Sequence, residues 1–271
     1  MLQYEKANYF RDQHNSPKLL MLPNVWDVMS AKLMESVGFH SLATASVALA
    51  AANGYPDDQH IPLELLLQQV SKIVRSVSVP VSVDFERGYS NNLSELQDNV
   101  KRLMDTGAIG INIEDSEAGG KGLKSIAEQC KILEMIRKVA NDQGINLVIN
   151  ARTDVYLNRQ IKQPVAEAIK RAKAYGDAGA DCFYPILISR MDELETLVKE
   201  TSIPINVLMI KPFANLLQLE QLGIKRVSLG PGMLNYAITK MQNVAKALRE
   251  YDTKGYFDEE SVNTAFLNQL I

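Results

Sequence analysis

Five acidic side chains stand where short apolar runs with strand character end. Asp84 and Glu86 follow the run in VSVDFERGYS, Asp57 lies in NGYPD, and the adjacent Glu114 and Asp115 close IGINIED. Mg²⁺ is held by a few carboxylate oxygens and keeps several waters, so acids gathered at the ends of parallel strands suit it. Oxygen ligands suit Mn²⁺ as well. The pattern predicts a metal-dependent enzyme, with Asp84, Glu86, Asp57 and Glu114 as the candidate metal-binding residues.

The alternation of side chains along VSVDFER places Asp84 and Glu86 on one face of the strand, so both can reach the same site. Two structural alternatives stay open, in which Glu86 caps the following helix and Asp84 pairs with a lysine. For Glu114 and Asp115 the alternative is a pair at a helix N-cap. Acids at three separate strand ends favour the metal-binding interpretation.

Arg152, in NARTD, follows an apolar strand, which indicates that its guanidinium group projects into the same mouth. A planar guanidinium forms paired hydrogen bonds with a substrate carboxylate. An ion pair of Arg152 with Glu114 or Asp154 is the alternative, and the two roles are compatible.

Two further segments carry candidate residues. In LATASVALAAANGYPD the small residues Thr44, Ala45 and Ser46 allow a ligand to approach backbone N–H groups, although alanine-rich segments also serve tight helix packing. The loop SEAGGKGLKS, residues 116–125, has three glycines and two lysines but lacks the spacing of a phosphate-binding loop. We interpret it as a lid that closes over the site and brings in Lys121, with an ordinary flexible turn as the alternative.

Composition limits the classes of partner. The 271 residues include 29 basic and 32 acidic side chains, for a formal net charge of −3, without a long run of one sign. Nucleic acid and membrane surfaces are therefore not expected, and a small-molecule carboxylic acid substrate is favoured. The first residues lack the apolar core of a signal peptide, which predicts a cytoplasmic protein. Cys130 and Cys182 are too few and too far apart in sequence for a disulfide framework or a zinc site.

Apolar runs that favour strands alternate with segments of helical period, such as residues 92–107 and 165–179. Glycine or another small residue ends several of these helical segments. The alternation predicts one (β/α)₈ TIM-type barrel spanning residues 1–271, with a doubly wound open sheet as the alternative. Residues 235–271 exceed what eight units need and are expected to form a C-terminal helical extension outside the barrel. The expected strands are residues 19–22, 40–44, 79–84, 109–113, 146–151, 182–186, 204–208 and 226–230.

The motifs ATASVALAAANGYPD, VDFERGY, GINIED and INARTD occur in this order. With them, the chain resembles the isocitrate lyase/phosphoenolpyruvate mutase superfamily over most of its length. The resemblance implies a (β/α)₈ barrel that forms a homodimer or homotetramer, with a C-terminal helix exchanged between subunits.

The resemblance also implies roles for individual residues. Asp84 matches the most direct Mg²⁺ ligand, while Asp57, Glu86 and Glu114 match acids that hold the ion through its waters. Arg152 matches a residue that binds a substrate carboxylate. The segment from Thr44 to Ser46 matches the loop that holds the 2-oxo acid by its backbone.

The chain departs from the pattern of isocitrate and methylisocitrate lyases in its lid. The KKCGH-like segment with an acid/base cysteine is missing from residues 116–125, which places the chain in a lyase-like branch without that motif. Lys121 or Lys124 could supply the proton instead. Apolar Ile186, Leu208 and Ile210 replace polar residues that bind a further carboxylate, so a smaller or more alkylated acid is expected.

The expected function is a Mg²⁺-dependent lyase that cleaves a C–C bond in a 2-hydroxy or 2-oxo carboxylic acid through a metal-stabilised enolate. Arg152, Glu114 and Lys121 are the candidate catalytic residues. Two alternatives stay open. One is an enzyme of another reaction, either an oxaloacetate-type hydrolase or decarboxylase or a phosphonate P–C bond enzyme. The other is a barrel that binds a metabolite without catalysis.

Overall fold

Parallel strands form a closed ring in the computed structural model, which describes residues 1–120, 122–257 and 261–270. Six strands, β2 to β7, pair in sequence order, and β1, β9 and β8 form a second run. The strands are β1 (Leu20–Leu22), β2 (Asn24–Val25), β3 (Leu42–Thr44), β4 (Val81–Asp84), β5 (Gly110–Glu114), β6 (Val148–Thr153), β7 (Cys182–Pro185), β8 (Asn206–Leu208) and β9 (Arg226–Ser228).

Two connections join these runs into a barrel. The segments β1 and β2 are separated by Pro23 alone, and β1 pairs with β9 while β2 pairs with β3. On the other side, a parallel bridge between Phe183 and Ile205 links β7 to β8. The predicted (β/α)₈ barrel is therefore confirmed, with β1 and β2 together acting as one of its strands, and the open-sheet alternative is wrong.

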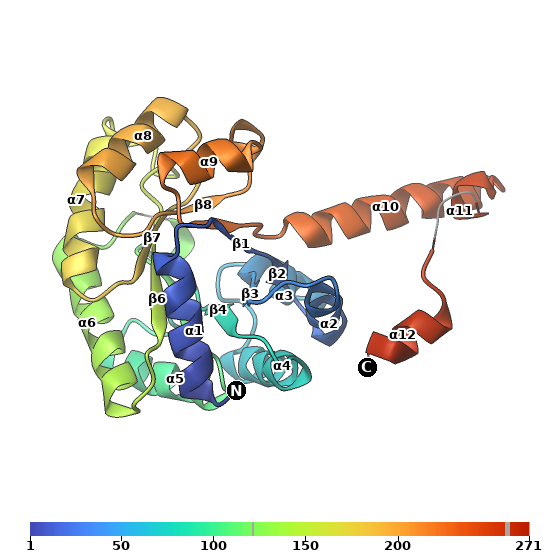
Figure 1. The fold of residues 1–271 in the computed structure, drawn as a ribbon, viewed down its shortest axis with the longest axis horizontal. Coiled ribbons are helices and arrows are strands. Elements are labelled where there is room, and N and C mark those ends of the chain that lie inside the picture. Colours follow the sequence, from blue (N-terminus) through green and yellow to red (C-terminus); the bar gives the residue numbers. More distant parts are fainter. Residues whose placement is uncertain (121, 258–260, 271) are drawn as a thin grey trace.

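Helices surround the strands (Figure 1). Several begin at N-caps that the sequence supplies, such as Asn92 before α5 and Ser125 before α6, whose side chains accept backbone N–H groups. The expected glycine endings are also present, since Gly38, Gly107 and Gly223 have φ angles of 97°, 93° and 97°. The helices are α1 (Gln3–Asn15), α2 (Val28–Ser36), α3 (Ser46–Ala52), α4 (Leu63–Ser76), α5 (Leu93–Asp105), α6 (Ile126–Asp142), α7 (Pro164–Asp177), α8 (Met191–Glu200), α9 (Leu216–Leu222), α10 (Gly232–Arg249), α11 (Lys254–Phe257) and α12 (Thr264–Leu270).

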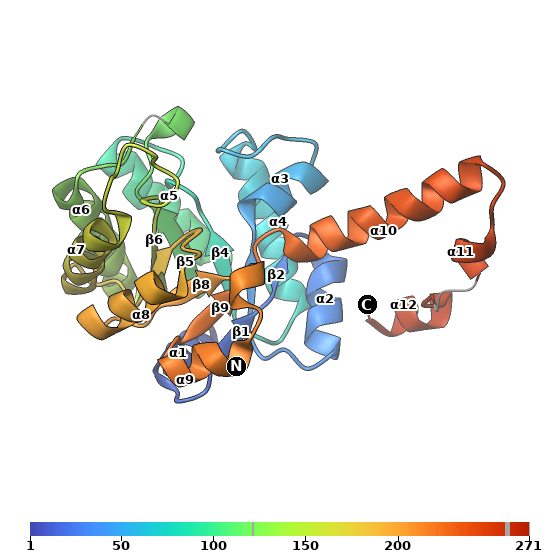
Figure 2. The same cartoon turned by 90° about the horizontal axis from the view of Figure 1, so that it is seen from above.

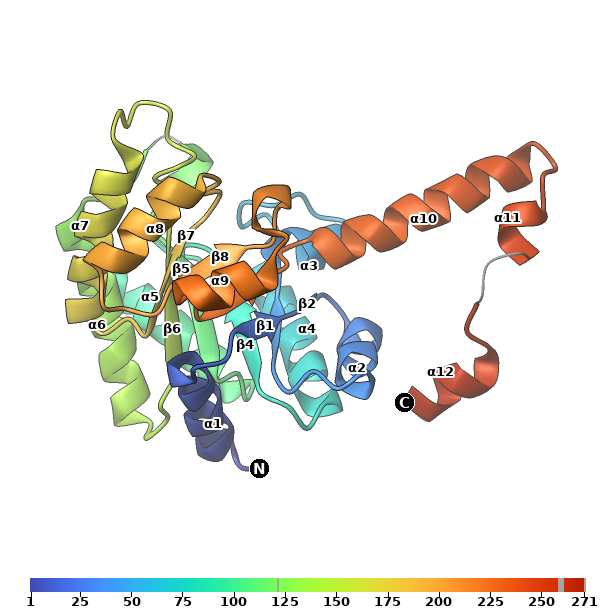
Figure 3. The same cartoon turned by 45° about the horizontal axis from the view of Figure 1, so that its top comes forward.

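Helix α1 covers the end of the barrel where the strands begin (Figure 3). Its Phe10 is fully buried in a small apolar cluster with residues at or near the strand starts, including Leu20, Ile109 and Val148. The larger apolar core lies between the strands and the outer helices. The barrel is thus closed at one end, and the opposite end is left for a site.

The C-terminal helices leave the barrel. Helix α10 projects away from the strands, and the chain then returns so that α12 contacts α2 (Figures 1 and 2). None of the residues of α10 is buried. Along the part of the chain that the structure describes, no helix has both the length and the apolar character needed to cross a membrane.

Replacing Phe10 by alanine is expected to lower the free energy of unfolding by about 3–5 kcal/mol, because it leaves a cavity in the cluster that closes the barrel. Urea denaturation measures this. Tyr9→Ala, on the exposed side of the same helix, is the control and should change stability by about 0.5 kcal/mol or less. Equal losses for the two variants would show that α1 does not seal the barrel through Phe10.

Candidate active site

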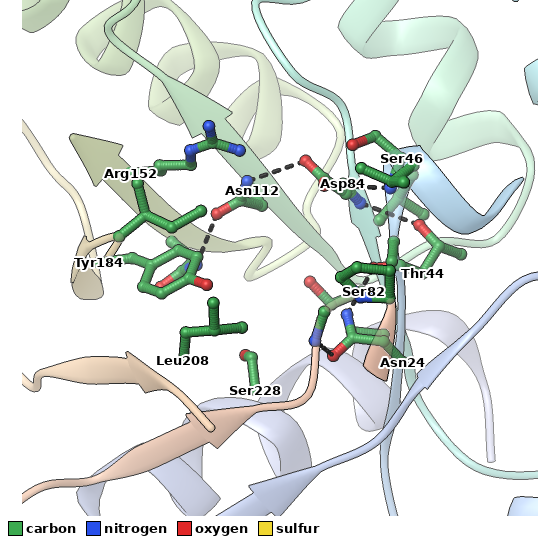
Figure 4. Close-up of a pocket in the computed structure, with 18 of the residues that line it drawn as sticks. Asn24, Thr44, Ser46, Ser82, Asp84, Asn112, Arg152, Tyr184, Leu208 and Ser228 are labelled. Atoms are coloured by element: carbon green, nitrogen blue, oxygen red, sulfur yellow. Dashed lines mark hydrogen bonds between the residues drawn. The ribbon is translucent and has the colours of Figure 1, made fainter. Parts of the chain in front are cut away.

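A cavity of about 240 Å³ opens at the carboxyl ends of the strands (Figure 4). In parallel α/β folds the loops that follow the strands converge at this end, which is where sites form. The residues that line the cavity are Asn24, Ala43, Thr44, Ala45, Ser46, Val47, Asp57, Ser82, Val83, Asp84, Asn112, Asn150, Arg152, Tyr184, Ile186, Leu208, Arg226, Ser228, Gly230 and Pro231.

Asp84, the last residue of β4, is held in place by three neighbours. Its Oδ2 accepts a hydrogen bond from the Ser46 backbone N–H at 3.2 Å, and its Oδ1 accepts one from Asn112 Nδ2 at 2.9 Å. The Asp84 backbone N–H donates to Thr44 Oγ1 at 3.0 Å. Thr44, Ala45 and Ser46 line the cavity, and the structure shows Thr44 and Ser46 positioning an acid.

Glu86 lies just beyond Asp84 in a strained position. Its φ angle is 50°, in the left-handed region that residues other than glycine seldom adopt, and its side chain is 4% exposed. Gln59 N–H donates to its carboxylate at 2.8 Å and the Tyr89 hydroxyl at 3.2 Å. Burial, together with the negative charge of nearby Asp84, raises the pKa of Glu86 to about 8.

The same electrostatic group includes Asp57 and Glu114, whose charges also raise the pKa of Glu86. Burial and the charge of Asp84 raise the pKa of Asp57. Carboxylates that raise one another's pKa values in a common mouth are a favourable environment for a divalent cation, because the cation relieves their repulsion.

The direct donor set is sparse. Among the described residues, no three His, Cys, Asp or Glu side chains converge closely enough to hold an ion by themselves. This geometry fits an ion that is bound through one or two carboxylates and otherwise through water, as Mg²⁺ commonly is. Of the four predicted acids, Asp57 and Asp84 line the cavity, whereas Glu86 and Glu114 are buried and do not. The carboxylates that line the cavity therefore fit a hydrated divalent ion.

Arg152 and Glu114 form an ion pair between neighbouring strands. Arg152 Nη1 lies 3.0 Å from Glu114 Oε2, and the rest of the guanidinium contacts the Asp154 carboxylate at 2.7 and 3.0 Å. Arg87 Nη1 approaches the other oxygen of Glu114 at 3.2 Å. Although burial alone lowers the pKa of Arg152, the two carboxylates raise it, so its charge is permanent. The ion-pair alternative is therefore present, and Arg152 also lines the cavity.

Asp115 is an exception among the five acids. Its side chain is fully buried and accepts hydrogen bonds from Arg171 Nη1 and from the Tyr175 hydroxyl, each at 2.8 Å. The Asp154 backbone N–H is a third donor at 3.0 Å. Asp115 therefore fixes the turn after β5 against α7 and is not among the residues that line the cavity.

The loop after β5 makes its own short structure. Ser116 and Leu123 form an antiparallel bridge, and Lys124 Nζ donates to the Ser116 carbonyl at 2.7 Å. Lys124 does not line the cavity. Lys121, the predicted proton-transfer residue, lies outside the described residues.

Several polar residues of the cavity were missed by the sequence interpretation. Asn24 accepts the Leu229 and Gly230 backbone N–H groups at 2.9 Å, and so ties β2 to the loop after β9. Asn150 donates to Asn112, which in turn donates to Asp84. Of the predicted apolar residues, Ile186 and Leu208 line the cavity and Ile210 does not. The additional polar residues of the lining are Asn24, Ser82, Asn112, Asn150, Tyr184, Arg226 and Ser228.

Comparisons with known proteins show which family the chain resembles. The model of the phosphoenolpyruvate phosphomutase family matches residues 10–249. An uncharacterized protein of Mycobacterium tuberculosis is 32% identical over 241 residues, which cover 89% of each chain. The 2-methylisocitrate lyase of Bacillus subtilis is 24% identical over 99% of this chain and 96% of its own.

Two further similarities concern different reactions. An oxaloacetate decarboxylase of Rhodopseudomonas palustris is 31% identical over 67% of this chain and 63% of its own. The structure of a phosphonopyruvate hydrolase in complex with oxalate and Mg²⁺ superposes with a TM-score of 0.84. It covers all of this chain and 95% of its own at 23% identity, and so supports the fold.

The raised pKa of Glu86 predicts a pH-dependent stability that a divalent cation removes. Because the folded pKa is about 8 and the ordinary value is 4.5, the folded protein keeps a proton that the unfolded chain releases. In chelator, the free energy of unfolding should fall as pH rises from 4.5 to 8, by at most about 1.4 kcal/mol per pH unit from this group. Added Mg²⁺ should flatten the decline.

Urea denaturation at pH 6 and pH 8, with chelator or with Mg²⁺, measures both effects. Glu86→Gln should remove most of the decline, whereas Glu195→Gln, an exposed glutamate of α8, should keep it. If the metal-free protein has the same free energy of unfolding at both pH values, the pKa of Glu86 is not raised.

Proposed function

The chain belongs to the phosphoenolpyruvate phosphomutase family, and on that premise we propose that it is a Mg²⁺-dependent lyase that cleaves a C–C bond in a 2-hydroxy or 2-oxo carboxylic acid. One observation carries the proposal: Asp84, fixed by Ser46 and Asn112, stands in a cavity beside Arg152 and within a group of mutually repelling acids.

Each residue of the site has a part in this proposal. Asp84 anchors the cation, and Asp57, Glu86 and Glu114 orient the waters around it. Arg152 holds a substrate carboxylate, and its pairing with Glu114 and Asp154 fixes the plane of its guanidinium. Thr44, Ala45 and Ser46 bring backbone N–H groups toward the 2-oxo or 2-hydroxy end.

The bound cation supplies Lewis-acid stabilisation of the negative charge that develops on the enolate oxygen. The chain itself orients the acid, so that the bond to be cleaved lies near the apolar side chains of Ile186 and Leu208. These side chains exclude water from that part of the cavity. Lys121, in the loop after β5, is the proposed proton-transfer residue.

Hydrolysis or decarboxylation of an oxaloacetate-type acid is the second candidate, supported by the similarity to the R. palustris decarboxylase. It uses the same cation and the same carboxylate clamp, so the two candidates differ in product and not in site. Identification of the products separates them.

The test is incubation of the protein with 2-hydroxy, 2-oxo and phosphono acids, in Mg²⁺ or in chelator, with products identified by mass. We expect chelator-sensitive release of a 2-oxo acid fragment. Asp84→Asn should lower kcat/KM by about 100-fold or more, because it removes the anchor of the cation. Asp98→Asn, an exposed aspartate of α5, is the control and should keep full activity. A decarboxylated or phosphorus-containing product would favour the other reactions, and binding without turnover would favour a binding protein.

We also propose that the protein is a homo-oligomer in which the C-terminal helices pack on a second copy. Helix α10 presents large apolar side chains to solvent, since Tyr236, Ile238 and Met241 are 64%, 50% and 70% exposed. Tyr256 and Phe257 of α11 extend this surface with exposures of 57% and 74%. Exposed large apolar side chains on neighbouring helices are typical of a subunit interface.

Sedimentation velocity tests the assembly. The wild-type protein should sediment as a dimer or a larger species, and the double variant Ile238→Glu with Met241→Glu should shift it toward the monomer, because charges oppose burial of the helix. Asn243→Glu, an exposed polar position on the same helix, is the control and should leave the mass unchanged. A wild-type monomer at micromolar concentration would contradict the proposal.

A further inference from the structure

The interior of this barrel is unusually polar. TIM barrels are commonly filled by layers of branched apolar side chains. Here Ser82, Asn112, Asn150 and Ser228 line the cavity between the strands, and each is at most 5% exposed. The cavity therefore continues from the acids at the mouth into a polar interior.

Arg226, the first residue of β9, is the charged residue of that interior. It is 2% exposed and lines the cavity. Its Nε donates to Ser228 Oγ at 3.1 Å. No described carboxylate lies within ion-pair distance of Arg226, and its buried Nη1 has no acceptor among the described residues. We call Tyr184, Arg226 and Ser228 the floor of the cavity, a name for the group only, since Tyr184 is in register with Arg152 and Ser228 ends β9.

A buried guanidinium without a carboxylate destabilises a folded protein, so a structural role is a poor explanation of Arg226. The other buried arginines of the site are paired. Arg152 contacts Glu114 and Asp154, and Arg87 contacts Asp58 and Glu114. Asp84 receives its hydrogen bonds from Ser46, Asn112 and the Glu86 backbone N–H and forms no ion pair with Arg226. The charge of Arg226 is therefore left for something that enters the cavity.

Two neutral donors lie beside this charge. Tyr184 points into the cavity between Asn112 and Leu208 (Figure 4), and its hydroxyl forms no hydrogen bond with a described residue. Burial raises the pKa of this hydroxyl, so it stays protonated and able to donate. Asn206, in register with Arg226 on the neighbouring strand, has a buried Nδ2 without an acceptor among the described residues. A cation and unpaired donors together match the oxygens of a carboxylate.

We propose that the floor is a carboxylate-binding subsite, in which Arg226 and the Tyr184 hydroxyl hold the second acidic group of a dicarboxylic acid substrate. The inference rests on the proposed function, which places the first acidic group of the ligand at Arg152, next to the cation that the metal-binding acids hold. Ile186 and Leu208 then flank the middle of the ligand. The apolar wall and the charged floor together favour a short dicarboxylic acid.

Calorimetric titration with lactate and with malate, in Mg²⁺, tests the subsite, because these 2-hydroxy acids differ in the second carboxylate. We expect the wild-type protein to bind malate about tenfold more tightly or better, as charge-assisted hydrogen bonds provide. Arg226→Gln should abolish this preference and leave the affinity for lactate within about twofold. Tyr184→Phe should reduce the preference several-fold. Arg190→Gln, an exposed arginine, is the control and should keep it.

Thermal melting without ligand distinguishes a binding role from a structural one. Arg226→Gln should melt at the wild-type temperature or above it, because an uncompensated buried charge is removed. Equal affinity of the wild-type protein for the two acids, or binding of neither, would overturn the subsite, as would an unchanged preference in Arg226→Gln. If that variant does not fold, an unchanged preference in Tyr184→Phe overturns it. Malate binding that depends on Arg226 supports the subsite even where no product forms. That result would contradict the proposed lyase activity and leave the subsite standing.

Discussion

Mutual repulsion of carboxylates at the mouth of the barrel is the constraint on which the site depends. Burial, and after it the charges of Asp84, Asp57 and Glu114, raise the pKa of Glu86 to about 8. These carboxylates stay close together because neighbouring parts of the fold hold them in place. The backbone of the β3 to α3 turn holds Asp84, and an adjacent arginine holds Glu114. The proposed divalent cation would relieve the repulsion and so couple folding stability to ion binding.

Because the interior of the barrel is polar, most of its stabilising apolar contacts lie outside the ring of strands. With amides and hydroxyls between the strands, apolar burial comes from the layer between strands and helices, where residues such as Ile111 and Phe85 are fully buried. Phe10 seals the end where the strands begin. The strands are therefore short, and their inward side chains are free to build a ligand cavity. Asn112 and Asn150 show the result, since each takes part in the hydrogen-bonded chain that ends at Asp84.

The strand positions, the barrel and the cavity-lining Asp57, Asp84 and Arg152 follow from the sequence because their signals are local. An apolar run, a glycine after a helix, and a charge at a strand end each depend on a few adjacent residues. The fate of Asp115 could not be predicted in this way, because it depends on Arg171 and Tyr175, more than fifty positions later in the chain. Arg226 gave no signal either, since a charge before an apolar run resembles a solvated strand start, and its burial depends on the closure of β9 against β1.

The two buried arginines of the cavity differ in whether a carboxylate of the protein pairs with them. Arg152 is matched by two carboxylates, which fix the plane of the guanidinium that we propose holds a substrate carboxylate. Arg226 is matched by none among the described residues, so it keeps its charge for a ligand. The proposed cation and Arg226 would together supply positive charge at two places in the cavity. An acid with a single carboxylate satisfies one of them and leaves the other buried and uncompensated, whereas a dicarboxylate satisfies both. Burying a charge without a partner costs more free energy than burying a neutral group. The arrangement therefore selects ligands by the spacing of their charges as well as by their size.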